Sequence, residues 1–238
     1  MTMRSLKDDE KNMLGTLYNN SDQFQDELKS IVERGFAIED EVAKESLLFI
    51  SMNPSYSKDG AWNNGTGERE NAIYKIPKLK DEKNPEETNS FFQAINRFYK
   101  ELNFANNIPP LAHHDLLFIR ETDQKNVLKW KKKLEQCSPD FFSKQLDLSK
   151  TIIEESEPKL IVVLNAGARE LFKELFNDDC NPSFCDKLGA NIYTINGNKT
   201  PVLFSGMLSG QRALDLGSQE SLKWHIKYIL KQIEEVNA

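Results

Sequence analysis

One asparagine at the end of an apolar run is the strongest candidate for chemistry in this sequence. The run Leu47–Ile50 is followed at once by Ser51-Met52-Asn53-Pro54-Ser55. An apolar run bounded by Asn-Pro-Ser predicts a buried strand that enters a sharp turn. Pro54 has no amide hydrogen and disfavours helical geometry at Asn53, so the strand must end there. The Asn53 amide should therefore sit on a stiff turn at a strand's carboxyl end, where open α/β sheets bind ligands, although an Asx-type turn without chemistry gives the same pattern.

Composition limits the classes of protein to which this chain can belong. It has 238 residues, 39% of them hydrophobic and 29% charged, and a formal net charge of −6. These values are ordinary for a globular protein with a substantial core. A net negative chain lacks the overall basic field of proteins that hold duplex DNA mainly by charge. The run Lys129–Lys133 is a local basic patch in the sequence, and a solvated helix face is the alternative interpretation.

The cysteines and apolar runs argue against several kinds of site and location. Three cysteines, an odd number, argue against a disulfide scaffold, and their spacing matches no closed zinc or iron–sulfur site. We therefore expect no metal and no cofactor. The segment Met1–Glu10 lacks an apolar signal core, and no apolar run approaches the ~18 residues of a membrane span. A soluble, cytoplasmic protein is expected.

Alternating strand and helix signals indicate the framework that positions Asn53. Ser21-Asp22 can cap a helix that ends near Gly35, and with a weaker segment over 6–17 it predicts a helical N-terminal extension over 1–39. The polar segment 58–87 predicts a long loop, which in a compact domain is usually functional or mobile. Further strands are predicted over 115–119, 160–164, 192–195 and 201–204, the last two joined by an Asn196-Gly197 hairpin, and helices begin near 88, 138, 168 and 218.

Strands that alternate with helices predict an α/β domain over 40–238. The expected architecture has three layers, α/β/α, around a mainly parallel, four-stranded central sheet. No internal repeat and no second domain boundary interrupt this segment.

Three strings within this domain resemble the uracil-DNA glycosylase superfamily, over roughly residues 40–238. Residues 48–55, Leu-Phe-Ile-Ser-Met-Asn-Pro-Ser, look like its first motif, a strand followed by Gly-x-Asn-Pro-Gly in the mismatch-specific branch. Residues 89–95, Asn-Ser-Phe-Phe-Gln-Ala-Ile, are similar to a helix start, Asn-x-Phe-Trp-x-x-Leu, and residues 158–168 to a Pro-Lys-x-Ile-Val-x-Leu-Gly segment. The resemblance implies a uracil-DNA glycosylase-like fold, and the branch with an iron–sulfur cluster is not a close relative because its cysteines are missing.

The resemblance implies hydrolysis of the bond between a damaged pyrimidine and its deoxyribose. The base must leave the stack, which costs least when it is mispaired or single-stranded, so the implied partner is single-stranded or mismatched DNA and we expect a monomer. Carried over by position, Asn53 would hold or polarise the attacking water. Ser51, Met52 and Ser55 would shape the pocket, and the helix from Asn89 would direct its positive end at the site.

Base recognition in such a site needs an aromatic face and polar groups. The candidate stacking rings, for each of which core or surface packing is the alternative, are Tyr56, Tyr74 and Phe91. Arg120, which would leave the sheet after the second strand, lies near a base-reading position of the family, and an ion pair with Glu121 or a neighbouring residue would explain it equally well. Asn165, in the third string, is also counted among the base-binding candidates.

The second motif departs from the family pattern. Residues 201–210 occupy its place, where a strand normally runs into His-Pro-Ser or Asn-Pro-Ser-Gly. If Ser209 and Gly210 align with that motif, Met207 stands where a histidine or asparagine normally donates to the leaving base, and methionine has no donor. Losing such a donor typically costs about 10²–10³ in rate. The residues that could supply a substitute, each with a surface or structural role as the alternative, are Gln211, Arg212, His113 and His114.

Three functions remain open at this stage. The leading hypothesis is a divergent DNA glycosylase that removes uracil or a related lesion, with Asn53 as the water-positioning group. A catalytically lapsed protein that binds a nucleobase or nucleic acid in the same pocket is the alternative, which Met207 and the negative net charge favour. Hydrolysis of another glycosidic or small nucleotide substrate is the third. A DNA enzyme should carry a basic rim around the site, whereas an enzyme for small substrates need not.

Overall fold

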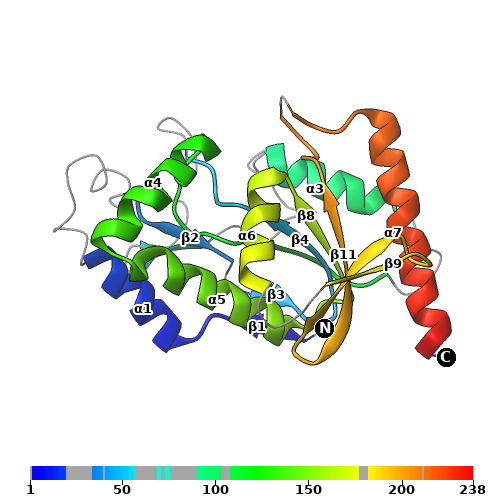
Figure 1. Ribbon diagram of the computed structural model, residues 1–238, viewed down its shortest axis with the longest axis horizontal. Coiled ribbons are helices and arrows are strands. Elements are labelled where there is room, and N and C mark those ends of the chain that lie inside the picture. The colour runs from blue at the N-terminus through cyan, green and yellow to red at the C-terminus, as the bar shows by residue number, and fades with distance from the viewer. Residues whose placement is uncertain are drawn as a thin grey trace.

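A six-stranded sheet with helices on both faces forms the centre of the molecule (Figure 1). The computed structural model describes residues 2–19, 34–39, 41–56, 69–70, 73–75, 90–102, 108–176, 182–210 and 212–237. The strand order is β7-β4-β8-β11-β10-β9. These strands are β4 (Leu47–Ser51), β7 (Leu111–Asp115), β8 (Leu160–Leu164), β9 (Ser183–Cys185), β10 (Ala190–Ile195) and β11 (Asn198–Ser205).

The sheet is mixed. Strands β7, β4, β8 and β11 pair in parallel, whereas β10 pairs antiparallel with both β11 and β9. The predicted hairpin is confirmed: Asn196 and Gly197 join β10 to β11 with φ values of +47° and +77°, as a two-residue turn of the primed kind requires. The α/β class is therefore confirmed, and the sheet has six strands rather than the four predicted.

Two hydrophobic clusters lie on opposite faces of this sheet. The first cluster contains Leu48 and Ile50 and is covered by α1 (Asp8–Asn19), α4 (Gln124–Cys137), α5 (Asp140–Ser156) and α6 (Ala166–Phe176). The second contains Leu47 and Phe49 and is covered by α3 (Ser90–Glu101) and α7 (Leu216–Asn237). Alternate residues of β4 thus face opposite layers, and all of β4 is buried. None of the helices in the described residues combines the length and apolar character needed to cross a bilayer.

Two small sheets lie beside the main one. Strand β1 (Met3–Ser5) pairs antiparallel with β3 (Glu41–Ala43), and β2 (Phe36–Ile38) pairs in parallel with β6 (Ile73–Lys75), which pairs with β5 (Arg69–Glu70). Leu14 and Leu17 of α1 join the first cluster, so the N-terminal segment carries a strand and a packed helix. The predicted helix after Ser21 and most of the 58–87 segment lie outside the described residues.

After two adjacent strands the chain continues to helices on opposite faces of the sheet. From β4 the chain continues through α3, on the second cluster, and from β8 it continues through α6, on the first cluster. Because β4 and β8 are neighbours and parallel, a crevice must open between their carboxyl ends. Ser51 ends β4, and Asn165 follows β8.

The predicted strand over 115–119 is wrong, because the strand is β7, four residues earlier. Residues 116–119 are buried and belong to no strand. Leu116 N donates to Ser51 O at 3.0 Å where the β4–β7 pairing ends, Phe118 N donates to Gln145 Oε1 at 3.0 Å, and Ile119 forms an isolated bridge with Phe36. The apolar character of residues 116–119 reflects their burial and does not indicate a strand. The carboxyl end of β7 is therefore Asp115, and Arg120 lies five residues beyond it.

Replacing Gln145 by leucine should lower the free energy of unfolding by about 1–3 kcal/mol. Gln145 is fully buried on α5, and its Nε2 donates to Phe141 O at 2.8 Å while its Oε1 accepts from Phe118 N. Leucine keeps the volume but leaves the Phe118 amide without a partner. Urea unfolding measures the change. The control Asp147→Asn, at an exposed position of the same helix, should stay within about 0.5 kcal/mol of wild type, and equal stability of the two variants would contradict the prediction.

Candidate functional site

A cleft of about 710 Å³ opens at the carboxyl ends of β4, β7 and β8. The first turns of α3 and α4 and the segment after β11 complete its wall. The predicted site residues that line it are Ser51, Asn53, Ser55, Phe91, Asn165, Met207, Ser209, Gly210 and Arg212. Residues that are far apart in the sequence therefore meet at the crevice that the strand order creates.

The side-chain amide of Asn53 is anchored by backbone carbonyl groups. Its Nδ2 lies 3.0 Å from Pro54 O, 3.3 Å from Ile119 O and 2.6 Å from Glu121 O. Three acceptors around the nitrogen fix the orientation of the amide, so Oδ1 is the atom on the other side. Oδ1 is buried and accepts no hydrogen bond from the described residues. Such an orphan acceptor is costly by about 1–3 kcal/mol, which makes a binding role for it a reasonable hypothesis.

The burial of this oxygen refines the prediction for Asn53. The residue does lie on the turn two positions beyond β4, on the cleft wall. Its Oδ1 exposes less than 1 Å² to solvent. A water molecule can therefore reach the oxygen only when neighbouring side chains move apart.

A buried chain of polar side chains runs from the interior to the cleft. Glu39 Oε1 lies 2.5 Å from His113 Nδ1, and His113 Nε2 lies 2.8 Å from Ser51 Oγ. The Ser51 hydroxyl donates in turn to Oδ1 of Asp115. Ser51 and Asp115 are the last residues of β4 and β7 and are direct partners in the parallel register. Asp115 lines the cleft, so the chain ends there.

When Asp115 is ionised, the hydrogen bonds of this side-chain network specify the charge of His113. Ser51 has one hydroxyl proton, which it gives to Asp115 when Asp115 is a carboxylate, and His113 Nε2 then donates to Ser51 Oγ. The Glu39 carboxylate can only accept, so Nδ1 must donate as well. In this state both ring nitrogens carry protons, and His113 is an imidazolium held between two carboxylates.

The pKa values follow from this arrangement. Burial raises the pKa of Asp115 to about 7, the charge of Glu39 acts in the same direction, and His113 and the Ser51 hydrogen bond oppose them. Burial alone would lower the pKa of His113, but Asp115 and Glu39 outweigh it and raise that pKa above its usual value. Burial alone would raise the pKa of Glu39, but His113 and His114 hold it at about 2.

The order Ser51–His113–Glu39 is that of a Ser–His–acid triad, but two observations argue against a nucleophilic serine. In a triad the serine gives its proton to the histidine, whereas Ser51 gives it to Asp115. The His113 side chain is 0% exposed and lies edge-on to Phe91 and Phe92, with ring centroids 5.4 and 5.2 Å away. It cannot reach a leaving group.

The same residues are the one cluster in the described part of the chain that could hold a metal ion. Ligating atoms of Glu39, His113 and Asp115 lie within 4.8 Å of one another. While both nitrogens of His113 act as donors, neither offers a lone pair to a cation. We interpret the cluster as a hydrogen-bonded network.

His114 belongs to the same strand and is also buried. Its Nε2 lies 3.1 Å from Ser149 Oγ, and its Nδ1 lies 3.6 Å from Glu39 Oε2. His113 and His114 were predicted to precede the second strand. They lie within β7, where the sequence His-His-Asp makes a strand that apolar periodicity does not reveal.

The end of the second-motif string, residues 206–210, folds back with residues 212–214 at the cleft, and we call these residues the second-motif segment. Met207 bridges to Ala213, and Leu214 N donates to Met207 O at 2.8 Å. Gly210 has φ of +83°, which glycine adopts without strain. Asn165 Nδ2 lies 3.4 Å from Met207 Sδ, so the thioether acts as an acceptor. Gln211 lies outside the described residues.

Asn165 has a structural role that explains its identity. Its Oδ1 accepts from Ala168 N at 2.8 Å and so caps α6, and its backbone has φ of +72°. Asparagine is among the residues that tolerate this left-handed conformation and is a preferred helix cap. Its side chain still lines the cleft.

Among the aromatic candidates, Phe91 alone lies on the cleft wall in the described residues. Tyr56 instead packs against two guanidinium groups, with Arg34 Cζ 4.4 Å and Arg120 Cζ 5.4 Å from its ring centroid. The side chain of Tyr74, on β6, lies outside the described residues. Phe91 is therefore the predicted stacking ring that lines the cleft, beside Phe92 of the same helix.

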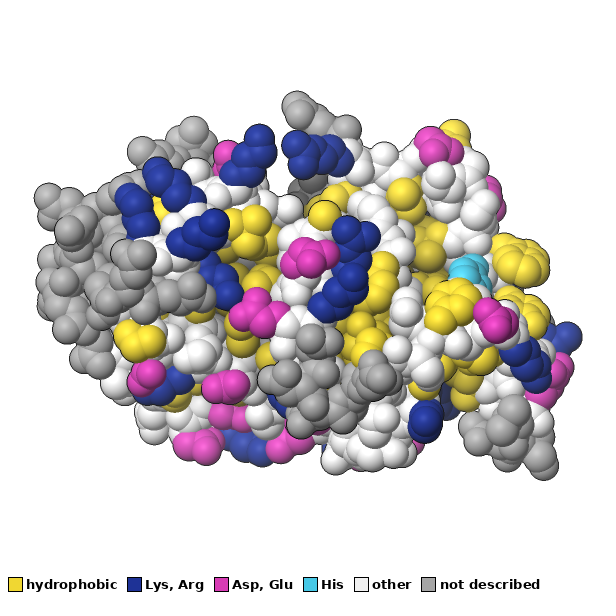
Figure 2. All heavy atoms as spheres, in the orientation of Figure 1, with side chains coloured by type: hydrophobic (Ala, Val, Ile, Leu, Met, Phe, Trp, Pro, Cys, Tyr) yellow, Lys and Arg dark blue, Asp and Glu magenta, His cyan; other side chains and the backbone are white. Residues whose placement is uncertain are grey.

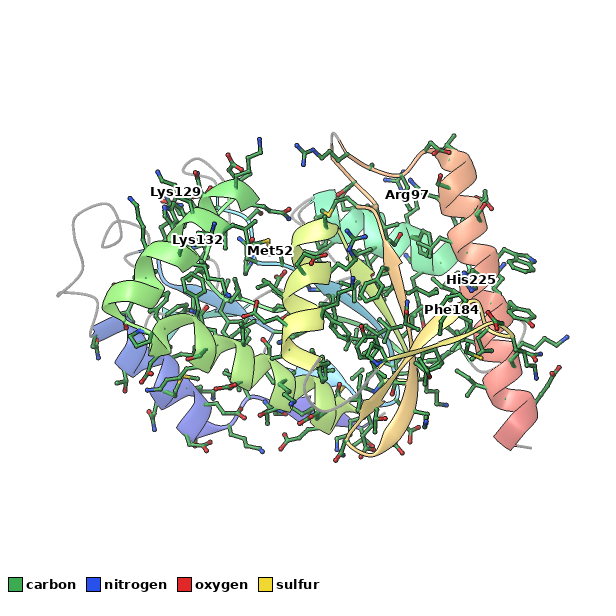
Figure 3. The ribbon with its side chains drawn as sticks, in the orientation of Figure 1. Met52, Arg97, Lys129, Lys132, Phe184 and His225 are labelled. Carbon is green, nitrogen blue, oxygen red and sulfur yellow. The ribbon has the colours of Figure 1, made fainter. Side chains whose placement is uncertain are left out.

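Two further candidates lie away from the cleft. Arg120 is 2% exposed, and its Nη1 donates to Arg34 O at 3.2 Å, while Glu121 pairs with Arg34 at 2.8 Å. Met52 is 0% exposed and lies under the first turn of α6 (Figure 3). A Cβ on Gly167 would come 2.6 Å from its Sδ, so the glycine permits this close approach.

Positive helix ends and both cationic and acidic side chains surround the cleft, whose wall includes Asp115, Glu121, Asp123, Lys125 and Arg212. Phe91 of α3, Lys125 of α4 and the α6 cap Asn165 line it, so three helix N-termini face it. Lys125, Lys129 and Lys132 are exposed on α4 at the spacing of one helix face. Figure 2 shows basic side chains gathered over α4, and Figure 3 shows Lys129 and Lys132 on that helix.

Comparison with known proteins adds no family to this description. No protein-family model matches the chain, and no curated protein sequence matches it significantly.

The free energy of unfolding should fall as the pH rises between about 5 and 7. Asp115 has an ordinary pKa of 3.8 when unfolded and about 7 when folded. The folded state therefore binds more protons in this range and loses stability as they leave, by up to about 1.4 kcal/mol per pH unit. The raised pKa of His113 acts in the same direction above its usual 6.5. Asp115→Asn should flatten this slope in urea unfolding.

The matched control is Asp123→Asn, at an exposed carboxylate of the same cleft. Asp123 caps α4 by accepting from Lys125 N at 2.9 Å, and asparagine caps equally well. This variant should keep the wild-type slope. Glu39 titrates between 4.5 and about 2, below the range measured. An unchanged slope in Asp115→Asn would refute the assignment.

Proposed function

We propose that this chain is a DNA glycosylase-like hydrolase that cleaves the N-glycosidic bond of uracil or a related damaged base in single-stranded or mismatched DNA. The observation that carries the proposal is the convergence of Asn53, Phe91 and the second-motif segment on one cleft at the carboxyl ends of β4 and β8. A uracil-DNA glycosylase-like arrangement of the parallel strands is part of the same proposal.

Asn53 is the water-positioning group of this reaction. Its Nδ2 is held by three carbonyl groups, so its Oδ1 keeps one direction and has unused lone pairs. An amide oxygen can orient a water molecule but cannot take its proton strongly. Because Oδ1 is buried, the proposal requires the cleft to open at Asn53 when the base enters.

The extruded base stacks on Phe91 and leaves as an anion toward helix N-termini. Base–aromatic stacking contributes about 1–3 kcal/mol per base. The cleft volume of about 710 Å³ is in the range of small-ligand sites and leaves room for a base with part of its sugar. The N-termini of α3, α4 and α6 favour negative charge that develops there.

DNA rather than a free nucleotide is favoured by the lysines of α4. Lys125 lines the cleft, and Lys129 and Lys132 continue from it along the exposed face of the helix. A row of cations that begins at a pocket suits a phosphate backbone that passes the pocket. It supplies a local basic rim in a chain whose formal net charge is −6.

Two observations favour the second candidate, a nucleobase-binding protein without turnover. Met207 accepts from Asn165 and offers no donor to a leaving base. Asn53 Oδ1 has almost no exposed surface in this conformation. This candidate predicts a thermal shift with nucleobases or abasic DNA and no base release.

Wild-type protein should release uracil from a single-stranded oligonucleotide, and Asn53→Ala should lower the rate by about 100-fold or more, because the variant lacks the oriented amide. Strand cleavage after alkaline treatment of the product measures base release. The control Asn12→Ala makes the same substitution at an exposed position of α1 and should match wild type.

Equal rates for wild type and Asn53→Ala would contradict the role of Asn53. Base binding without release by wild type would favour the second candidate. Release from free nucleosides but not from DNA would identify an enzyme for small substrates. Thermal unfolding of each variant shows whether a loss of rate reflects a loss of folded protein.

The double substitution Lys129→Gln/Lys132→Gln should weaken DNA binding and reduce its salt dependence. If both lysines contact phosphates, the slope of log affinity against log salt should drop by about 1.4 for a single strand. The rate at saturating DNA should not change, because neither residue lines the cleft. Fluorescence anisotropy at several salt concentrations measures the slope.

The matched control is Lys159→Gln/Lys199→Gln. Both lysines are exposed and lie at the amino ends of β8 and β11, whereas the cleft lies at the carboxyl ends of the parallel strands. This pair makes the same change in net charge and should keep the wild-type slope. Equal salt dependence of DNA binding in the two double variants would argue against DNA passing along α4.

A further inference from the structure

We infer that Asp115 is the acid–base group of the cleft and that Ser51 connects it to His113 as a proton relay. The inference rests on the proposed function for the reaction that it serves. The relay itself is a property of the folded protein and can be tested without a substrate.

The geometry requires Ser51 as the connecting group. His113 Nε2 lies 3.9 Å from Asp115 Oδ1, too far for a direct hydrogen bond. Ser51 Oγ lies 2.8 Å from that nitrogen and donates to that oxygen, so it bridges the gap. Asp115 is 2% exposed yet lines the cleft, so a ligand there can meet its carboxyl group.

Two arrangements of the same protons are available to this chain. In one, His113 is an imidazolium that donates to Ser51, and Ser51 donates to an Asp115 carboxylate. In the other, the His113 Nε2 proton has moved to Ser51 Oγ, and the Ser51 proton has moved to Asp115. His113 is then neutral and Asp115 is a carboxylic acid. The network holds the same number of protons in both arrangements. A proton is therefore transferred from buried His113 to Asp115, on the cleft wall, without exchange with solvent.

Glu39 keeps the histidine end of the relay in place. Its Oε1 accepts from His113 Nδ1 in both arrangements, which fixes the ring and the tautomer. Its other oxygen lies 3.6 Å from His114 Nδ1. The remaining charged side chains on the cleft wall are Glu121, Asp123, Lys125 and Arg212. Glu121 pairs with Arg34 and Asp123 caps α4, and neither belongs to the hydrogen-bonded chain.

The relay supplies the step that Asn53 cannot perform. As the C1′–N bond breaks, its electron pair goes to the base, which leaves as an anion and then takes the proton of the Asp115 carboxylic acid. Water adds its oxygen to C1′, and the proton that it loses returns to the Asp115 carboxylate. The products are the free base and the sugar hydroxyl, and the protein regains its starting proton count. Asp115 thereby replaces the donor that Met207 lacks.

Nuclear magnetic resonance on the wild-type protein tests the relay directly. The imidazole nitrogens of His113 and the carboxyl carbon of Asp115 should share a titration, each showing the other's inflection near pH 7. In Ser51→Ala the two groups should titrate separately. Independent titrations in the wild type would overturn the relay even if no variant folds, and even if no substrate is turned over.

Kinetics on a uracil-containing oligonucleotide tests the role of Asp115. Asp115→Asn should lower kcat by about 100-fold or more, leave KM within a few-fold and abolish the loss of rate above pH 7. Ser51→Ala should lower kcat by a smaller factor, and Ser51→Thr, which restores a hydroxyl, should recover part of it. The controls Asp147→Asn and Ser143→Ala, both at exposed positions of α5, should match wild type.

The outcomes separate this inference from the proposed function. If wild-type protein releases uracil and Asp115→Asn does so equally well, Asp115 has no acid–base role and the proposed function stands. If wild-type protein releases no base while His113 and Asp115 share a titration, the relay stands and the proposed function fails.

Discussion

The parallel register between β4 and β7 is the constraint on which the site depends. It pairs the last residues of the two strands, Ser51 and Asp115, and so brings a hydroxyl, a carboxyl group and the preceding His113 onto one face. A slip of one residue would turn these side chains to the opposite face of the sheet. Both strands are buried throughout, so the hydrophobic layers on either face hold the register.

A buried cluster of two carboxylates and an imidazolium is a poor choice for stability alone. Removing charges from water costs several kcal/mol per ion, and apolar side chains of similar volume often serve equally well or better. His113 even packs against both Phe91 and Phe92, where an apolar residue would pack without penalty. The cluster meets the cleft wall at Ser51 and Asp115. A costly network that opens onto a cleft is more readily explained by function than by folding.

Sequence patterns predicted the parts of the fold in which burial and strand pairing coincide. Strands β4 and β8 and helix α3 were found because apolar runs and caps mark them, and the candidates Asn53, Phe91 and Met207 line one cleft. Strand β7 was missed because its polar residues His113, His114 and Asp115 are satisfied by partners more than 30 positions away in the chain. The four apolar residues after it are buried without joining the sheet. No local pattern contains those partners, so Asp115 could not be predicted.

The segment after β7, which was predicted to be a strand, connects Asn53 and Asp115. Directly after Asp115 the chain bonds back to the β4 exit, with Leu116 N on Ser51 O and Leu117 N on Met52 O. A few residues on, the carbonyl groups of Ile119 and Glu121 hold the Asn53 amide. Movement of this segment would therefore shift Asn53 and Asp115 together. Because Asn53 Oδ1 is buried at rest, a displacement that exposes it to water also changes the position of the acid, and the two groups would come into reach of a substrate in the same event.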